Sequence, residues 1–465
     1  MTTMAKKKIL LNAFNMNAVG HINHGLWTHP RDRSAHYTDL DYWTNLAQTL
    51  ERGKFDGIFL ADIVGVYDVY QGGPGTPLRD AVQIPINDPA LIVPAMAHVT
   101  KHIGFGVTAN LTYEPPYLFA RRMSTLDHLT KGRVGWNIVT GYLDSAARGM
   151  GLAQQVSHDD RYDRADDYMD VVYKLWEQSW EDDAVVRDRE ARVFSQPGKV
   201  HRIKHAGPYY SIDAIHLSEP SLQRTPVLYQ AGSSARGVDF AARHAECVFI
   251  GGQNKALTRS IVDDIRSRAV RFGRAPDDIK IFVGITVVVD RTEKAAQEKF
   301  DEYRRYASAE GGLAHFSSST GIDFAEYALD EPISYVKTNS MQSAVEAISS
   351  RSTTGVWTKR KVLEQMQLGG RTKPFVGSPQ QVADELQSWL DEAGVDGFNL
   401  TRTVMPESFE DFVDLVVPEL QNRGIYKTDY DPAPTLREKL FGAGRARLPD
   451  EHAGAQYRLR AKALA

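Results

Sequence analysis

Short apolar segments rich in β-branched residues alternate with amphipathic, helix-like segments along this 465-residue sequence. Eight apolar segments predict strands, with approximate bounds 8–14, 57–63, 104–112, 134–140, 225–232, 247–252, 279–290 and 397–403. Each is followed, directly or after a longer connection, by a segment with helical periodicity. Parallel strands need helix-sized crossovers, and eight strand–helix pairs are the number that closes a barrel. We therefore expect an α/β fold, a single (β/α)8 TIM barrel.

The chain is longer than a minimal barrel, which needs about 250 residues. We expect one elaborated domain over residues 1–465, with insertions at about 64–87, 179–224 and 308–377 and a C-terminal extension at 425–465. Long insertions after barrel strands build the pocket at the C-terminal mouth. The 308–377 segment is polar and rich in glycine, serine and threonine, which predicts a mobile cover over the mouth or a disordered loop.

Composition argues against several classes of function. The net charge of −4 gives no reason to expect nucleic acid or an anionic membrane as a partner. No run of 18 apolar residues is present, so we expect no membrane-spanning helix. The single cysteine, Cys247, cannot form an internal disulfide and lies in an apolar run typical of a core. Together with the lack of a recognisable signal peptide, this favours a cytoplasmic protein.

Polar residues at the ends of the predicted strands are the first candidates for a site. They are Asn12, Asp62, Asn110, Asn137, Thr140 and Asn399. The carboxyl ends of parallel strands are where α/β folds bind ligands, so several such residues from different strands indicate a polar mouth. Any one of them can equally well pair within the core.

Two strand–helix loops carry residues suited to a phosphate. They are His158, Arg161 and Tyr162 after the fourth strand, and Gly232, Ser233 and Ser234 after the fifth. Free backbone N–H groups and the positive dipole end at a helix start attract anions, and small residues let the backbone approach the ligand. The sequence therefore favours a phosphate site split between two helix starts over two plain strand–helix turns.

The common nucleotide and metal motifs are absent or out of context. The run Gly104–Ala109 matches the pattern G-x-G-x-x-A, but it lies inside a predicted strand instead of opening a helix. No P-loop, H-E-x-x-H, Cys–His zinc spacing or G-x-S-x-G elbow occurs. The sequence therefore predicts neither a metal site nor a built-in NAD(P)H-binding module.

Several longer stretches carry a resemblance to a known family. They are LERGKFDGIFLAD, ARRMSTLDHLTKGRVGWNIVT, HDDRYDRADDYMDVVYKLWEQSWEDDAV, RTPVLYQAGSSARG and VADELQSWLDEAGVDGFNL. The chain resembles, essentially end to end, the bacterial luciferase-like superfamily in its two-component FMN-dependent monooxygenase branch. That branch includes nitrilotriacetate, dibenzothiophene-sulfone, long-chain alkane and dimethyl-sulfide monooxygenases and riboflavin lyase. The alkane enzyme carries a cysteine where Ala18 stands here, which argues against alkane hydroxylation.

The resemblance places FMN at the C-terminal mouth of the barrel. It implies that Asp62, Asn110, Asn137 and Tyr142 border the ring system and ribityl chain, and that His158, Tyr162, Gly232, Ser233 and Ser234 hold the phosphate. It also implies that His21, Tyr67, Gln83, His315 and Trp357 face the substrate. His21 is then a candidate acid or base near neutral pH.

The function implied by the resemblance is a two-component monooxygenase. Such an enzyme takes reduced FMN (FMNH2) from a separate NAD(P)H:flavin reductase and uses O2 to oxidise or cleave a small organic substrate through a flavin peroxide. The missing nucleotide motif agrees with a separate reductase, and a homodimer or homotetramer is expected. Two alternatives stay open. One is a riboflavin lyase-like enzyme that cleaves the ribityl chain of riboflavin, and the other is a flavin-binding protein without oxygenase activity.

Overall fold

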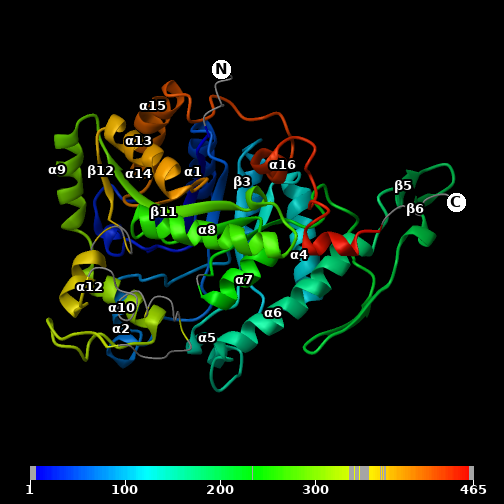
Figure 1. The fold of residues 1–465 in the computed structure, drawn as a ribbon, viewed down its shortest axis with the longest axis horizontal. Coiled ribbons are helices and arrows are strands. Elements are labelled where there is room, and N and C mark those ends of the chain that lie inside the picture. Colours follow the sequence, from blue (N-terminus) through cyan, green and yellow to red (C-terminus); the bar gives the residue numbers. More distant parts are fainter. Residues whose placement is uncertain are drawn as a thin grey trace.

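A closed barrel of parallel strands forms the centre of the molecule (Figure 1). The structure, a computed structural model, describes residues 7–459 except 233, 335–339, 341–344, 346–354, 367, 369 and 371–372. Within these residues the barrel strands are β1 (Leu10–Met16), β2 (Gly57–Ala61), β3 (Gly104–Asn110), β4 (Val134–Val139), β9 (Val227–Gln230), β10 (Cys247–Ile250), β11 (Lys280–Val289) and β13 (Gly397–Thr401). β1 pairs with β2 and β13, and β10 pairs with β9 and β11, so the ring is closed. The predicted TIM barrel is confirmed, and every predicted strand is present.

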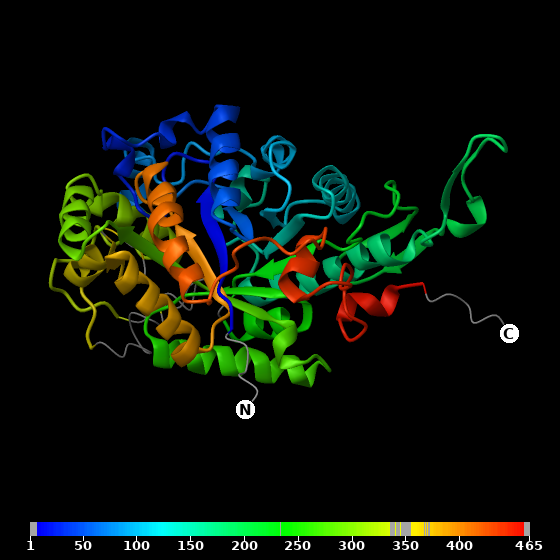
Figure 2. The same ribbon diagram turned by 90° about the horizontal axis from the view of Figure 1, so that it is seen from above.

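Helices surround the barrel (Figures 1 and 2). The main ones are α1 (Leu40–Arg52), α3 (Val93–His98), α4 (Pro116–Thr130), α6 (His158–Tyr173), α7 (Ala235–His244), α8 (Lys255–Arg271), α9 (Glu293–Arg304), α13 (Pro379–Ser388), α14 (Glu407–Asp411) and α15 (Val417–Asn422). Ser378 caps α13 by accepting a hydrogen bond from the Gln381 N–H. Lys131, in a left-handed conformation, caps the end of α4. No helix within the described part of the chain is long and apolar enough to cross a membrane.

The N-terminal end of the barrel is closed by α16 (Leu436–Phe441), which belongs to the C-terminal extension. Leu436 packs in a buried cluster with Tyr229 and Cys247, so the cysteine is a core residue as expected. The neighbouring Arg437 is buried and donates to both carboxylate oxygens of Glu246, at 2.6 and 3.0 Å. Side chains therefore fill this end of the barrel, and the carboxyl ends of the strands lie at the opposite end, the mouth.

The long insertions have structure of their own. The 179–224 segment forms two antiparallel hairpins, β5 (Val185–Asp188) with β6 (Val193–Ser195) and β7 (Ile203–Ala206) with β8 (Ser211–Ala214). The first of these hairpins projects from the body of the molecule (Figures 1 and 2). The insertions at 64–87 and 308–377 add α2 (Gly75–Arg79), α10 (Ala309–Thr320), α12 (Lys359–Met366) and β12 (Phe375–Gly377), which pairs with β11, and α5 (Asp144–Gly149) lies in the loop between β4 and α6. The division into one domain with these insertions stays a prediction.

The expectation of an irregular cover at 308–377 is wrong over α10. Ser308 caps this helix by accepting from the Gly311 N–H at 2.8 Å. Leu313 and Phe316 pack in a hydrophobic cluster with side chains from α12, so most of the helix is buried. The serine-rich stretch that suggested disorder is therefore the buried face of a capped helix, and α2, α10 and α12 lie together (Figure 1).

Candidate active site

A cavity of about 220 Å3 opens at the carboxyl ends of β2, β3, β4 and β9. Asp62 follows β2, Asn110 ends β3, Tyr142 follows β4 and Gln230 ends β9, and all four line it. A neighbouring hollow of about 370 Å3 shares Asp62, Asn110 and Thr108 with this cavity. The two hollows together offer space of the order that a cofactor-sized ligand needs. The polar mouth predicted from the strand ends is thus assembled from four strands.

One wall of the cavity is made of two helix starts. α6 begins at His158, and its cap Ser157 accepts from the Asp160 N–H. α7 begins after Ser234, whose hydroxyl accepts from the Gly237 N–H at 3.1 Å. The Ser234 hydroxyl also lies 3.2 Å from His158 Nε2. The positive ends of two helices therefore converge beside a serine and a histidine, an arrangement that suits an anion.

Tyr162 fills the space between two glycines at this wall. A Cβ atom added to either Gly232 or Gly237 would lie 2.7 Å from the Tyr162 hydroxyl oxygen, so only glycine fits both places. The side chains of Ser234 and Gln230 are hydrogen-bond partners of this hydroxyl. Burial raises the pKa of Tyr162, so the phenol stays protonated.

Gln230 supplies a test of whether a cofactor fits here. Its Oε1 atom is buried and has no hydrogen-bond partner among the described residues. An unsatisfied buried acceptor is costly, and a ligand hydroxyl at the cavity wall would satisfy it. An anion-binding wall next to an unused acceptor and a group of strand-end polar residues matches the phosphate, hydroxylated chain and polar ring of a flavin nucleotide.

Asp62 is the titratable group that both hollows share. Burial is the largest influence on it and raises its pKa to about 7, because the charged form is poorly solvated there. A hydrogen bond from the Ile63 N–H opposes this shift, and the nearby Asp88 and Glu114 carboxylates reinforce it. Near neutral pH the Asp62 carboxyl therefore exists in both protonation states and can donate as well as accept a hydrogen bond.

Three of the residues expected to face the substrate meet beside Tyr142. The Tyr67 hydroxyl donates to Gln83 Oε1 at 2.6 Å and lies 3.2 Å from the Tyr142 hydroxyl oxygen. The Tyr67 ring stacks on His315 of α10, with centroids 5.1 Å apart and planes at 13°. His315 Nδ1 lies 3.0 Å from His24 Nε2. The insertion helix α10 is thus joined to the cofactor cavity through Tyr67.

His21 lies in the loop after β1 and is buried. Its ring packs edge-on against Phe14, with centroids 4.5 Å apart. Burial, and after it the charges of Arg402 and His24, lower the pKa of His21 well below its usual value. His21 is therefore a neutral imidazole near pH 7, which can accept a proton but has no imidazolium proton to release.

The remaining predicted residues lie elsewhere or outside the described part of the chain. Trp357 packs against the α10–α12 cluster that contains Phe316. Asn137 does not line the cavity, and its Nδ2 donates to Thr108 Oγ1 at 2.8 Å inside the barrel. Ser233 lies outside the described residues. The expected roles of these three stay predictions.

Arg402 holds the loop that carries both histidines. Its guanidinium is buried and donates to the backbone carbonyls of Ala18 and Val19, both at 2.7 Å. Its own carbonyl accepts from Asn23 Nδ2 at 2.8 Å. One residue directly after β13 thus holds both ends of the loop 18–24, the first end through its guanidinium and the second through its backbone carbonyl.

The sequence reasoning did not assign Gln230, Arg402 or His24. Gln230 ends β9 and Arg402 directly follows β13, so the strand-end rule that selected Asp62 would also have selected them. His24 offers no such signal, because its contact with α10 exists only in the folded chain.

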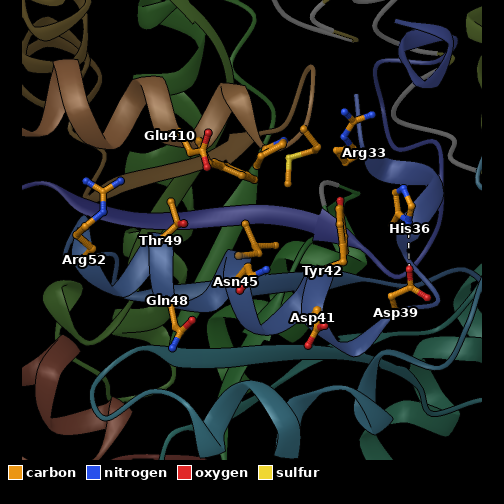
Figure 3. Close-up of a pocket in the computed structure, with 14 residues that line it drawn as sticks. Arg33, His36, Asp39, Asp41, Tyr42, Asn45, Gln48, Thr49, Arg52 and Glu410 are labelled. Atoms are coloured by element: carbon orange, nitrogen blue, oxygen red, sulfur yellow. Dashed lines mark hydrogen bonds and ion pairs between the residues drawn. The ribbon is translucent and has the colours of Figure 1, made fainter. Parts of the chain in front are cut away.

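A larger hollow of about 710 Å3 lies on the outer face of the barrel, between α1 and α14 (Figure 3). Charged side chains of both signs line it, among them Arg33, Arg52 and Glu410. None of the predicted site residues that the structure describes lies in its wall. Since helix flanks and not strand ends form it, we place the site at the mouth.

Comparison with known proteins identifies the family. The family described as "Luciferase-like monooxygenase" matches residues 22–397. The long-chain alkane monooxygenase of Geobacillus thermodenitrificans (strain NG80-2) is 53% identical over 452 residues, which cover 97% of this chain and 98% of the relative. The dimethyl-sulfide monooxygenase of Hyphomicrobium sulfonivorans is 51% identical over 453 residues, with 97% and 94% covered. Fold and site therefore define a barrel enzyme, a flavin-dependent monooxygenase. The chain belongs to the luciferase-like monooxygenase family.

A solved structure supports the same assignment. The chain is similar to a crystal structure of riboflavin lyase with modified FMN and substrate riboflavin, with a TM-score of 0.92 and 39% sequence identity. The match covers 98% of this chain and 100% of the lyase chain. The family resemblance seen in the sequence is thereby confirmed.

Proposed function

We propose that the mouth cavity binds FMN in its reduced form, and that the enzyme uses it with O2 to oxidise or cleave a small organic substrate. One observation carries this proposal. A single cavity joins strand-end polar residues to two converging helix starts and contains an unused buried acceptor, Gln230 Oε1. These features complement a polar ring system, a phosphate and a hydroxylated chain.

The cofactor contacts follow from the cavity wall. FMN would fit with its phosphate at the starts of α6 and α7, where His158, Tyr162, Gly232 and Ser234 would hold it. Ser233 lies outside the described residues, and its role at the phosphate stays a prediction from the sequence. Asp62, Asn110 and Tyr142 would border its ring system and ribityl chain, with Asn137 behind them in the barrel. Gln230 Oε1 would accept a hydrogen bond from a ribityl hydroxyl.

Reduced FMN, when bound, would supply the two electrons with which one oxygen atom of O2 enters the substrate and the other leaves as water, and the flavin would end oxidised. The chain's own residues bind, orient and exclude water. Tyr67, Gln83 and His315 form the substrate side next to Tyr142. His21, a neutral imidazole, accepts a proton or a hydrogen bond there, and Trp357 packs behind α10.

A separate NAD(P)H:flavin reductase supplies the reduced flavin. This part of the proposal is supported by the lack of any nucleotide-binding motif in the sequence. A homodimer or homotetramer and a cytoplasmic location also stay predictions.

The substrate proposed first is a small organic sulfide, and an alkane is the second candidate. Relatives named for dimethyl sulfide and for long-chain alkanes are 51% and 53% identical to this chain. Ala18 weighs against the alkane, because the resemblance described above implies a cysteine at this position in the alkane enzyme. Tyr67 and Gln83 line the substrate side with polar groups that suit a heteroatom.

The test combines the purified enzyme, a flavin reductase, NADH, FMN and O2. The substrate panel holds dimethyl sulfide, alkanes, aryl sulfones, aminopolycarboxylates and riboflavin, and products are detected by mass spectrometry. A product that is one oxygen atom heavier, or cleaved next to a heteroatom, is expected. No flavin binding, or flavin binding without any product, would contradict the proposal.

A second candidate function is cleavage of riboflavin. It is favoured by the similarity to the riboflavin lyase structure, at a TM-score of 0.92. A second flavin would then occupy the hollow of about 370 Å3 beside the cofactor cavity. Loss of riboflavin from the same reaction mixture, with no oxidation of the other compounds, distinguishes this function from the first.

A further inference from the structure

His24 is a buried histidine in the loop after β1 with one hydrogen-bonding contact of its ring, to His315. Its Nε2 atom lies 3.0 Å from His315 Nδ1, and the two rings meet edge to face at 74°. Its other nitrogen, Nδ1, is buried and has no partner within the described part of the chain. The hydrogen-bonding contact of the His24 ring is therefore made with His315, a residue that is proposed to face the substrate.

The backbone fixes His24 against the start of α10, the helix that carries His315. The Ser308 N–H donates to the His24 carbonyl oxygen at 2.8 Å. A Cβ atom added to Gly311 would lie 3.1 Å from the His24 Cβ atom, so the helix start packs closely on this residue. The distance between the two histidine rings is thus set by the fold and not by free rotation of a side chain.

His24 carries no charge at working pH. Burial is the largest influence and lowers its pKa to about 3, Arg402 acts in the same direction, and Asp80 opposes them. A neutral imidazole has one N–H group. A buried N–H without an acceptor is rarer than a buried lone pair without a donor, so the proton belongs on Nε2, where His315 accepts it.

We propose that His24 is a positioning residue, which donates from Nε2 to His315 Nδ1 and thereby fixes the tautomer and ring plane of His315. With Nδ1 as the acceptor, His315 carries its own proton on Nε2. The importance of this for turnover rests on the proposed role of His315 at the substrate.

The orientation of the His315 ring affects the cavity at the mouth because this ring stacks on Tyr67. His315 lies parallel to Tyr67, at 13° and 5.1 Å between centroids. The Tyr67 hydroxyl donates its proton to Gln83 Oε1 at 2.6 Å. Its oxygen therefore accepts the hydrogen bond from the Tyr142 hydroxyl. A rotated His315 ring would remove the surface on which Tyr67 packs. His24 therefore holds in place the successive contacts of His315, Tyr67 and Tyr142, and Tyr142 lines the cavity.

Two matched variants separate this role from simple space filling. In His24→Gln the amide nitrogen takes the place of Nε2 and keeps the donor. In His24→Asn the amide nitrogen takes the place of Nδ1, and the donor to His315 is lost. Both side chains are polar, uncharged and smaller than histidine, so a difference between them reports the hydrogen bond.

The primary measurement is the nitrogen spectrum of the protein labelled with 15N-histidine. His315 signals are assigned by their loss in His315→Gln. Wild type and His24→Gln should show His315 protonated on Nε2, and His24→Asn should show a shift toward protonation on Nδ1. With FMN affinity unchanged, kcat should fall about tenfold to hundredfold in His24→Asn and recover in His24→Gln, as expected for lost positioning.

Several results would overturn the inference. One is protonation of His315 on Nδ1 in the wild-type protein, which decides the matter even where neither variant folds. Another is identical spectra and kcat for wild type and His24→Asn. Equal losses in both variants without a spectral change would indicate a packing role only. If wild type turns over no substrate while the spectra behave as described, the proposed function fails and the positioning role of His24 stands.

Discussion

The hydroxyl oxygens of Tyr67 and Tyr142 lie 3.2 Å apart, at the boundary between the cofactor cavity and the cluster proposed to face the substrate. Because Tyr67 donates its proton to Gln83, Tyr142 is the donor in this contact. The two sides of the site are therefore coupled by one hydrogen bond, and substitutions on the two sides should have different effects.

Tyr67→Phe should lower kcat/KM without changing the affinity for FMN. The variant loses the hydrogen bonds to Gln83 and Tyr142, and its ring can still stack on His315. We expect a loss of about tenfold, the rate equivalent of one hydrogen bond. Steady-state kinetics and flavin fluorescence titration measure the two quantities. Tyr117→Phe is the matched control, because it removes a hydroxyl that donates to the Ile215 carbonyl at 2.9 Å and lies outside the site.

Gly232→Ala should weaken FMN binding and destabilise the fold. The new Cβ atom would lie 2.3 Å from Gln230 Nε2 and 2.7 Å from the Tyr162 hydroxyl oxygen, so the phosphate wall must shift. We expect a cost of about 1–3 kcal/mol, typical of overpacking, and a Kd for FMN raised at least about tenfold. Gly251→Ala, after the next strand and with no atom within 4 Å of the added Cβ, should change neither value. Calorimetry and urea unfolding test both variants, and equal behaviour would contradict the proposed packing.

Asp62→Asn should change how stability depends on pH. In the folded protein the pKa of Asp62 is about 7, above its ordinary value of 3.8, so between these values the folded chain binds more protons than the unfolded chain. The free energy of unfolding of the wild type therefore falls as pH rises through this window, whereas asparagine does not titrate. The variant should gain stability relative to wild type from about pH 4 to pH 7, and the difference should stay constant above that. Urea unfolding at several pH values measures it, and parallel curves would refute the assignment.

Arg402→Met should loosen the loop that carries His21 and His24. The guanidinium donates to two backbone carbonyls, which would be left buried without it. Hydrogen bonds from a charged group contribute about 1.5–3 kcal/mol each, so we expect the free energy of unfolding to fall by about 3 kcal/mol. Arg402→Lys should recover only part of the lost free energy of unfolding, because an ammonium group lacks the planar fork of a guanidinium group. Hydrogen exchange of residues 18–24 should accelerate in both variants of Arg402. Arg33→Met, in the hollow between α1 and α14, should leave the exchange of these residues unchanged.

The barrel and much of the mouth could be predicted because they depend on local patterns. Apolar runs such as 279–290 mark strands at any position in a fold, and polar residues at strand ends such as Asp62 follow from the direction of the strands. The wall formed by the starts of α6 and α7 was predictable for the same reason, since a helix start after a glycine–serine turn is recognisable in sequence, and its binding of a phosphate stays a prediction.

The features of the fold and the site that were not predicted depend on contacts between segments that are distant in the sequence. The α10 stretch was read as irregular because its serines are polar, although the Ser308 cap before Leu313 and Phe316 was a helix signal. The contact of His24 with His315 joins residues 291 positions apart, and no local pattern reports it. Likewise, that Asn137 pairs with Thr108 inside the barrel follows from strand register, which strand bounds alone do not fix.

The closure of the barrel floor by α16 bears on how this chain matures during synthesis. The ring cannot close until β13 reaches β1, and the floor stays open until Leu436 and Arg437 have left the ribosome. Before these residues are made, the buried cluster lacks Leu436 and the Glu246 carboxylate lacks its ion-pair partner. A chain cut just before Leu436 would keep every strand of the barrel and still leave this apolar end open, so we expect it to fold poorly and to be degraded faster than the uncut chain.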